Sequence, residues 1–197
     1  MNQVIEAIAN RRSIRRYQER PVEPGIITAL LEAATRAPNA VNRQPWSFVV
    51  VQDPERRARL ADVSRLLGVK MNQVAQAPLV VAVLGNPRTS SFLDYDCSLA
   101  AGNLMLAAHS LGLGTCWVGA FDSRAVQAIL AVPHPWKVVA LITIGYPAQG
   151  QPAQVRLPLE HVVHYETFGG APGFSWRRGP WSFLGKVLAK RARHENP

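Results

Sequence analysis

The segment from Tyr95 to Leu111 places the strongest constraint on how this chain can fold. It has the pattern of a long helix, and the preceding Asp94 is suited to cap its N-terminus. Its side chains are apolar on nearly every side, with Leu99, Leu104 and Ala108 among them. Such a helix must be covered on several sides. In a chain of 197 residues we therefore expect a central helix or a helix at a subunit interface.

Short apolar runs rich in β-branched residues predict strands. The clearest run is Ser47–Val51, which we expect to be buried on both faces. Helices and strands are mixed without strict βαβ regularity, so the sequence predicts an α+β domain with a central sheet flanked by helices. The predicted strands are 47–51, 78–84, 113–121 and 138–146, and the other predicted helices are 4–10, 24–36, 53–67 and 124–131.

Composition excludes several classes of protein. With 48% hydrophobic residues the chain is able to bury one sizeable core. Cys97 and Cys116 are too few for a disulfide scaffold and too distant for a Cys-x-x-Cys pair, so we expect small buried side chains. No apolar run approaches ~18 residues, and no signal peptide is visible. We therefore expect a cytoplasmic protein.

A cluster of arginines follows the first predicted helix. Arg11, Arg12, Arg15 and Arg16 lie within six residues, with Ser13 between them. Guanidinium groups remain charged and present a planar fork of donors that matches a phosphate, and a hydroxyl can donate to the same oxygens. The cluster therefore suits an anion site, and the alternative is a solvated basic loop, the commonest environment of an arginine cluster.

A loop rich in amide side chains follows the second predicted helix. It contains Asn39, Asn42 and Gln44 and leads directly into the strand at 47–51. Amides donate and accept at once, so these residues suit a heterocycle with a mixed edge of carbonyl and N–H groups. The alternative is an ordinary Asx-type turn.

The sequence shows no set of side chains able to carry chemistry alone. We find no Ser-His-Asp arrangement, no paired carboxylates and no metal-ligand spacing, and we expect His109 to serve the end of its helix. Gly119 follows a predicted strand, where its backbone can approach a flat ligand. Any chemistry would therefore require a bound cofactor.

Five landmarks in order resemble the nitroreductase-like family of FMN-dependent flavoproteins, from about Val4 to Phe168. That resemblance implies an α+β fold with a central mixed sheet, an intertwined homodimer and two FMN sites at the subunit interface. The landmarks are residues 11–15, 37–46, 96–106, 112–119 and 156–159.

The resemblance also implies roles for individual residues. Arg11, Ser13 and Arg156 would hold the FMN phosphate, and Arg12 would contribute through its backbone. Arg15 would lie toward the ribityl chain and the N1/O2 edge of the ring. Two further sets of residues would surround the ring. The backbone of Gly119 and Ala120 would lie near N5, and the partner subunit would contribute Pro38, Asn39, Ala40, Asn42 and Gln44.

The implied activity is that of an NAD(P)H-dependent oxidoreductase. Hydride would enter at flavin N5, and a small-molecule acceptor such as a nitroaromatic or a quinone would then be reduced in a ping-pong cycle. The resemblance supplies no catalytic side chain and no metal. An FMN-binding module or sensor without significant turnover is the alternative, and a basic RNA- or membrane-binding protein is a third.

The C-terminal residues differ from the rest of the chain. Residues 171–197 contain six cationic residues and one acidic residue, which is +5 of the total charge of +9. The body is thus not strongly basic, and we expect no nucleic-acid partner. The glycine-rich 169–173 suggests a boundary between an FMN-binding domain, 1–168, and a basic extension, 169–197. We expect the extension to pack on its own dimer or fray, with anionic lipid as the alternative contact.

Overall fold

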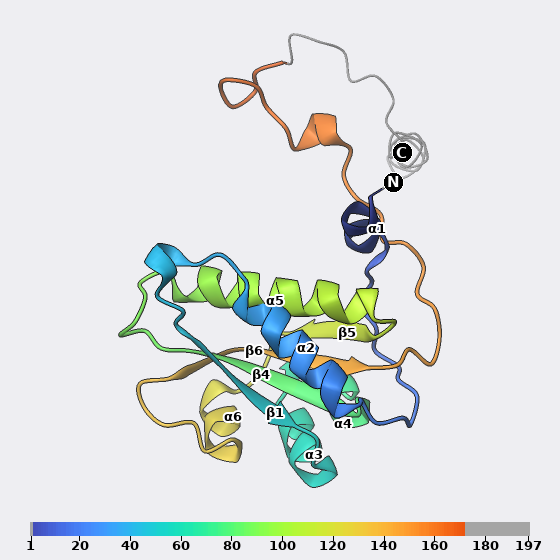
Figure 1. Cartoon of the computed structure of the whole chain (residues 1–197), viewed down its shortest axis with the longest axis vertical. Coiled ribbons are helices and arrows are strands. Elements are labelled where there is room, and N and C mark those ends of the chain that lie inside the picture. The colour runs from blue at the N-terminus through green and yellow to red at the C-terminus, as the bar shows by residue number, and fades with distance from the viewer. Residues whose placement is uncertain (1, 172–197) are drawn as a thin grey trace. The chain divides into compact units, whose positions relative to one another are not determined.

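The computed structural model describes residues 2–171, and the chain forms two compact units, Met1–Pro152 and Ala153–Pro197. The centre of the first unit is a four-stranded sheet in the order β1-β4-β6-β5, with every neighbouring pair antiparallel (Figure 1). The two inner strands are almost wholly buried, which fits their continuous apolar sequence. The strands are β1 (Trp46–Val51), β4 (Leu79–Gly85), β5 (Gly114–Val118) and β6 (Lys137–Gly145).

Helices cover both faces of this sheet (Figure 1). One buried cluster lies between the sheet and the helices α2 and α5, and a second lies on the opposite face with α3, α4 and α6. The predicted α+β class is therefore confirmed. The helices of this unit are α1 (Gln3–Asn10), α2 (Pro24–Thr35), α3 (Pro54–Asp62), α4 (Gln73–Gln76), α5 (Leu93–Ser110) and α6 (Ser123–Ile129).

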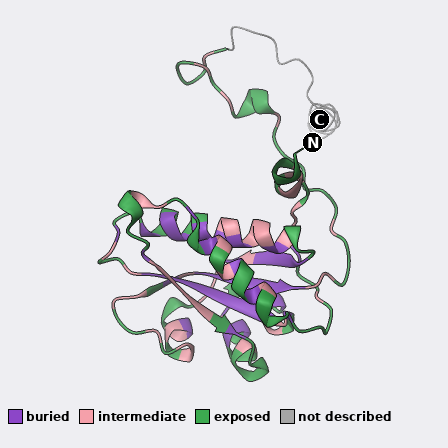
Figure 2. Ribbon diagram, viewed as in Figure 1, coloured by how far each residue is buried: buried purple, intermediate pink, exposed green. Residues whose placement is uncertain are grey.

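The long helix α5 is central, as its sequence predicts, but one of its faces is not covered by any residue that the structure describes. Its inner face contributes seven buried residues, whereas Tyr95 is 73% exposed and Leu99 47% exposed. Figure 2 shows buried, intermediate and exposed stretches alternating along the long helix. Tyr95 and Leu99 are four positions apart and so lie on one side of the helix. The prediction that Asp94 caps α5 is wrong, because the helix begins earlier: Phe92 occupies the N-cap, and Asp94 lies in the first turn.

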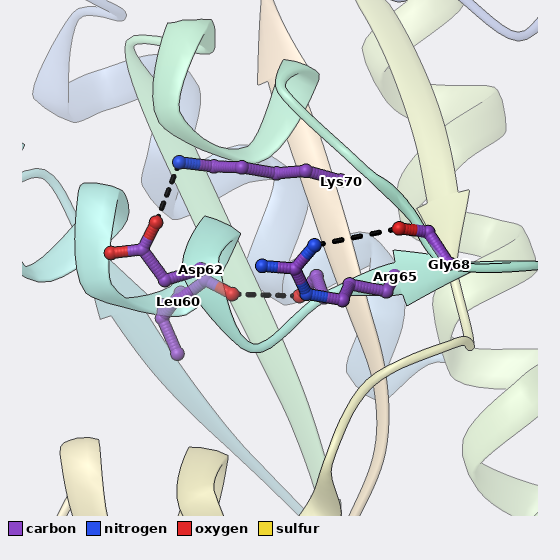
Figure 3. Close-up of polar contacts among 6 residues, drawn as sticks. Leu60, Asp62, Arg65, Gly68 and Lys70 are labelled. Atoms are coloured by element: carbon purple, nitrogen blue, oxygen red, sulfur yellow. Dashed lines mark hydrogen bonds and ion pairs between the residues drawn. The ribbon is translucent and has the colours of Figure 1, made fainter.

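The predicted helix 53–67 is wrong in its second half. Asp53 caps α3 by accepting from the Arg56 amide at 2.7 Å, but α3 ends at Asp62. The chain then forms a two-stranded hairpin, β2 (Arg65–Leu66) and β3 (Val69–Lys70), whose turn has positive φ at Leu67 and Gly68. Lys70 Nζ lies 2.6 Å from Asp62 Oδ1 and ties the hairpin to α3 (Figure 3). The apolar periodicity that predicts a helix gives no information about this ion pair.

The expectation that 47–51 is buried on both faces is also wrong. β1 is an edge strand, and most of its residues are only half-buried. The four named strands of the sheet pair antiparallel. One parallel pairing is present at the edge of the sheet, where Ser13 forms an isolated bridge with Thr115 of β5.

The second unit is described over 153–171 and contains the short 3-10 helix η2 (Leu159–His161). In the part of the chain that the structure describes, no helix has the length and apolarity needed to cross a membrane. Most of the predicted extension 169–197 lies outside the described residues, so its boundary and its contacts stay predictions.

Candidate functional site

The arginine segment, residues 11–16, is fixed to the edge strand β5. The helix α1 ends where the Arg11 amide donates to Ala7 O at 3.0 Å, and the chain then runs extended beside β5. The Ile14 amide donates to Thr115 O at 2.8 Å. The Tyr17 hydroxyl donates to Ile14 O at 2.6 Å, and burial raises the pKa of Tyr17, so it remains a donor. Backbone and side-chain bonds thus hold both ends of this segment.

Alternate side chains of the segment point to opposite sides. Ser13 pairs with Thr115, and paired residues of a ladder share one face. Arg11 and Arg15 are two positions from Ser13 and lie on that same face, whereas Ile14 points the other way and is 7% exposed. The Arg12 guanidinium donates to Ala9 O at 2.6 Å and Arg11 O at 2.9 Å, at the C-terminal end of α1. The Arg12 guanidinium is therefore engaged by carbonyl groups at the C-terminal end of α1.

Two buried polar atoms on the Ser13 face have no hydrogen-bond partner among the described residues. They are Arg11 Nη1 and Thr115 Oγ1. Leaving a buried donor unpaired costs about 1–3 kcal/mol, and more when it is charged. Both residues line a cavity of about 270 Å³, together with Arg12, Ile14, His109, Pro147 and 149–151, whereas Ser13 and Arg15 are not in its wall. Unpaired donors around a cavity are suited to an anionic ligand.

His109 in the wall of this cavity and the two buried cysteines have pKa values shifted toward their neutral forms. Burial and the charges of Arg11 and Arg12 lower the pKa of His109, so its imidazole is uncharged at neutral pH. Burial raises the pKa of Cys116 although Arg15 acts in the opposite direction, and burial raises the pKa of Cys97 to about 12. Both cysteines are buried thiols, as expected, and neither has the character of a reactive thiolate.

The amide loop, residues 39–44, is held in a strained conformation. Val41, Asn42 and Gln44 all have φ near +50°, a region that non-glycine residues rarely adopt. Each such residue costs on the order of 1–3 kcal/mol, so the surroundings must over-determine the loop. Asn39 Oδ1 accepts from the Gln44 amide at 2.8 Å and closes the loop on itself. Val41 is 88% exposed at its tip.

Asp96 is the residue that sequence reasoning missed. It is 3% exposed in α5, and its Oδ1 accepts from the Ala40 amide at 3.0 Å. Its Oδ2 accepts from the Ser90 hydroxyl at 2.7 Å. One carboxylate therefore anchors the amide loop and the loop before α5. The signal available was an acidic residue on an otherwise apolar helix, where a charge must be paired.

The amide loop and the arginine segment are not brought together within one chain. Asp96 anchors the loop at the start of α5, and His109 lies near its end, about 20 Å away at 1.5 Å per residue. The exposed Gly119 and half-buried Ala120 follow the far end of β5, about 13 Å along the strand from Thr115. Arg156 belongs to the second unit and is exposed there, so its role at the phosphate stays a prediction.

The fold is that of an α+β protein with a cavity beside the arginine segment, at the edge of its sheet. The family model described as Nitroreductase family matches residues 8–146. The chain therefore belongs to the nitroreductase family, as the sequence landmarks predict.

Relatives of known sequence and structure agree with this placement. An NADH dehydrogenase of Thermus thermophilus is 32% identical over 195 residues, with 80% of this chain and 93% of that protein covered. An FMN reductase (NAD(P)H) of Bacillus subtilis is 29% identical over 191 residues, with 85% and 75% covered. An FMN-dependent nitroreductase of Clostridium difficile superposes with a TM-score of 0.77 at 28% identity, with 83% and 99% covered.

Proposed function

We propose that this protein is an FMN-dependent NAD(P)H oxidoreductase of nitroreductase type, active as a homodimer. In this proposal the arginine segment of one chain and the amide loop of its partner form each FMN site. The observation that carries the proposal is a pair of buried donors with no partner in the described part of this nitroreductase-family chain. They are Arg11 Nη1 and Thr115 Oγ1, and both residues line the cavity beside the arginine segment.

The residues present fit the phosphate end of FMN. Arg11 would bind the phosphate through Nη1, which has no partner among residues 2–171, and Ser13 would share its face. Arg12 contributes backbone here, because its guanidinium is engaged at the end of α1. Relatives named FMN reductase and FMN-dependent nitroreductase support the choice of FMN and of NAD(P)H as donor.

The groups assigned to the ring are also suited to it. Gly119 is exposed beyond β5, so its backbone amide is available to a planar ligand on the same chain as the phosphate site. Asn42 and Gln44 are exposed in a loop whose strained backbone is fixed by Asp96. Fixed amide dipoles stabilise negative charge on a reduced ring without reorganisation. When bound, FMN would supply reversible hydride exchange between NAD(P)H and an acceptor such as a nitroaromatic or a quinone.

The homodimer is supported by the separation of the two halves of the site and by uncovered apolar surface. The amide loop lies at the opposite end of α5 from the arginine segment, so one chain cannot enclose a flavin with both. Tyr95 and Leu99 form an exposed stripe on α5, and Val4, Ile5 and Ile8 are exposed on α1. Apolar helix faces of this kind are typical of obligate interfaces.

Anaerobic stopped-flow spectroscopy tests the activity. We expect the absorbance band of the bound flavin to bleach on mixing with NADH or NADPH and to return on adding a nitroaromatic or a quinone. Bleaching by neither nucleotide would leave only an FMN-binding module. The two nucleotides are compared at equal concentration, which also measures the donor preference.

Substitution of Arg11 tests the phosphate assignment. Arg11→Met should weaken FMN binding by on the order of 10- to 100-fold, because charge-assisted hydrogen bonds contribute ~1.5–3 kcal/mol. Riboflavin lacks the phosphate, so its affinity should not change. Arg16→Met is the matched control, because Arg16 is an exposed arginine of the same segment. Equal loss of FMN and riboflavin affinity would contradict the assignment.

Substitution of Leu99 tests the interface. Leu99→Glu places a charge on the exposed α5 stripe, and we expect a monomer in sedimentation velocity and a loss of bound flavin. Glu is tolerated in helices, so the fold of the monomer should persist. A Leu99→Glu protein that remains a flavin-loaded dimer would show that this face is not the interface.

A further inference from the structure

We infer that His109 and Thr115 complete the phosphate site and that His109 takes up a proton when the phosphate binds. The inference rests on the proposed function and adds two residues to it. It makes the retention of the phosphorylated cofactor dependent on pH, through a residue of α5 that has no part in holding the ring.

Both residues line the cavity that Arg11 also lines. Ser13 pairs with Thr115 across the parallel bridge, so the two hydroxyl side chains leave the ladder on the same side. Thr115 Oγ1 is buried and unpartnered among the described residues, as is Arg11 Nη1. His109 lines the same cavity from the end of α5. Three groups able to donate hydrogen bonds therefore surround one cavity.

Among the described residues, the two charges that shift the pKa of His109 are both positive. The ionised groups that act on it are Arg11 and Arg12, both from the segment after α1, and the other polar side chains of the cavity wall, such as Gln149 and Gln151, are neutral. Together with burial these cations hold the imidazole neutral while no anion is present. Neutral imidazole donates from one ring nitrogen only.

A bound phosphate reverses this balance. A phosphate dianion screens the two guanidinium groups and attracts the imidazolium, so the second ring nitrogen takes a proton from solvent and both nitrogens become donors. No covalent bond is formed or broken. By linkage, a proton taken up on binding means that affinity for the phosphate increases as the pH falls through the His109 titration. The Thr115 hydroxyl donates without any change in charge.

Calorimetric titration of the full-length protein, freed of flavin by dialysis, tests this inference. FMN and riboflavin are each titrated at pH 6.5 and 7.5 in two buffers of different ionisation enthalpy, which yields affinity and proton uptake. The variants are His109→Gln, Thr115→Val and Thr115→Ser. His134→Gln is the matched control, because His134 lines a different cavity beside Trp136.

With FMN, the unsubstituted protein should take up more protons than His109→Gln, by up to about one per site. Comparison of the two proteins cancels the titration of the phosphate itself, whose second pKa lies near 6. The preference for FMN over riboflavin should fall about tenfold in His109→Gln and in Thr115→Val, since each loses one donor to a charged acceptor. Thr115→Ser and His134→Gln should keep it.

The inference and the proposed function fail in different ways. If both flavins bind, but His109→Gln and Thr115→Val keep the full preference for FMN and the full proton uptake, the inference is overturned and the FMN site stands. If the unsubstituted protein binds neither flavin, the proposed function is wrong and the inference falls with it. Unchanged riboflavin affinity in the variants shows that their fold is intact.

Discussion

Replacing Asp96 by asparagine is the substitution that most directly probes how the amide loop is built. The side chain is 3% exposed, and its two oxygens accept from the Ala40 amide and the Ser90 hydroxyl. Asparagine has nearly the same shape but offers one carbonyl oxygen and an NH2 group. It can retain the bond from Ala40 or the bond from Ser90 in its present form, but not both.

The expected loss of stability follows from these contacts. A hydrogen bond to a charged acceptor contributes ~1.5–3 kcal/mol, so Asp96→Asn should cost about that amount. For a chain of this size 1 kcal/mol corresponds to about 2–4 °C, which gives a fall in Tm of roughly 4–8 °C for about 2 kcal/mol. Asp96→Ala removes both bonds and should cost about twice as much. The asparagine variant should still fold, because domains are stable by about 5–15 kcal/mol.

Thermal unfolding followed by circular dichroism, with FMN in fixed excess, measures this effect. Asp94→Asn is the matched control, because Asp94 is exposed two positions earlier on the same helix. We expect its Tm to lie within about 1 °C of the unsubstituted protein, as is usual for surface changes. An Asp96→Asn variant as stable as the Asp94→Asn control would refute the view that this carboxylate holds the loop.

Two further predictions concern the surroundings of the site. Hydrogen bonds from the Tyr146 hydroxyl and Arg20 lower the pKa of Glu23 to about 2 from an ordinary 4.5. The stabilisation by ionised Glu23 should therefore be complete above pH 4.5 and disappear as the pH falls toward 2. The difference in Tm between Glu23→Gln and the unsubstituted protein should close over that range. A difference that stays constant would exclude this ion pair. At Gly114, an added Cβ would lie 2.5 Å from Ile14 Cγ1. Gly114→Ala should then cost ~1–3 kcal/mol and weaken FMN binding by displacing the arginine segment, and unchanged denaturant unfolding would contradict this.

The sequence predicted the framework because its signals are local. Apolar periodicity located α2 and α5 and the strands of the sheet to within a few residues. The predicted helix 124–131 corresponds to α6, which Asp122 caps by accepting from the amides of Arg124 and Ala125. The arginine segment was identifiable because cations and a hydroxyl so close together need an acceptor. The loop of amide side chains was identified by composition alone.

The errors arose where distant residues decide the outcome. α3 stops at Asp62 because the following residues pair as a hairpin held by Lys70, a contact that periodicity cannot contain. β1 is less buried than its apolar sequence suggests because it lies at the edge of the sheet. Asp96 was overlooked because its importance depends on Ala40, which is far away in the sequence.

Identification of the chromophore in the purified protein is the most direct test of the central claim. We predict a yellow protein that releases FMN on denaturation, at one FMN per chain and two per dimer. Removal of the flavin followed by incubation with excess FMN should restore the same stoichiometry. A colourless protein that takes up no FMN from an excess would contradict the account.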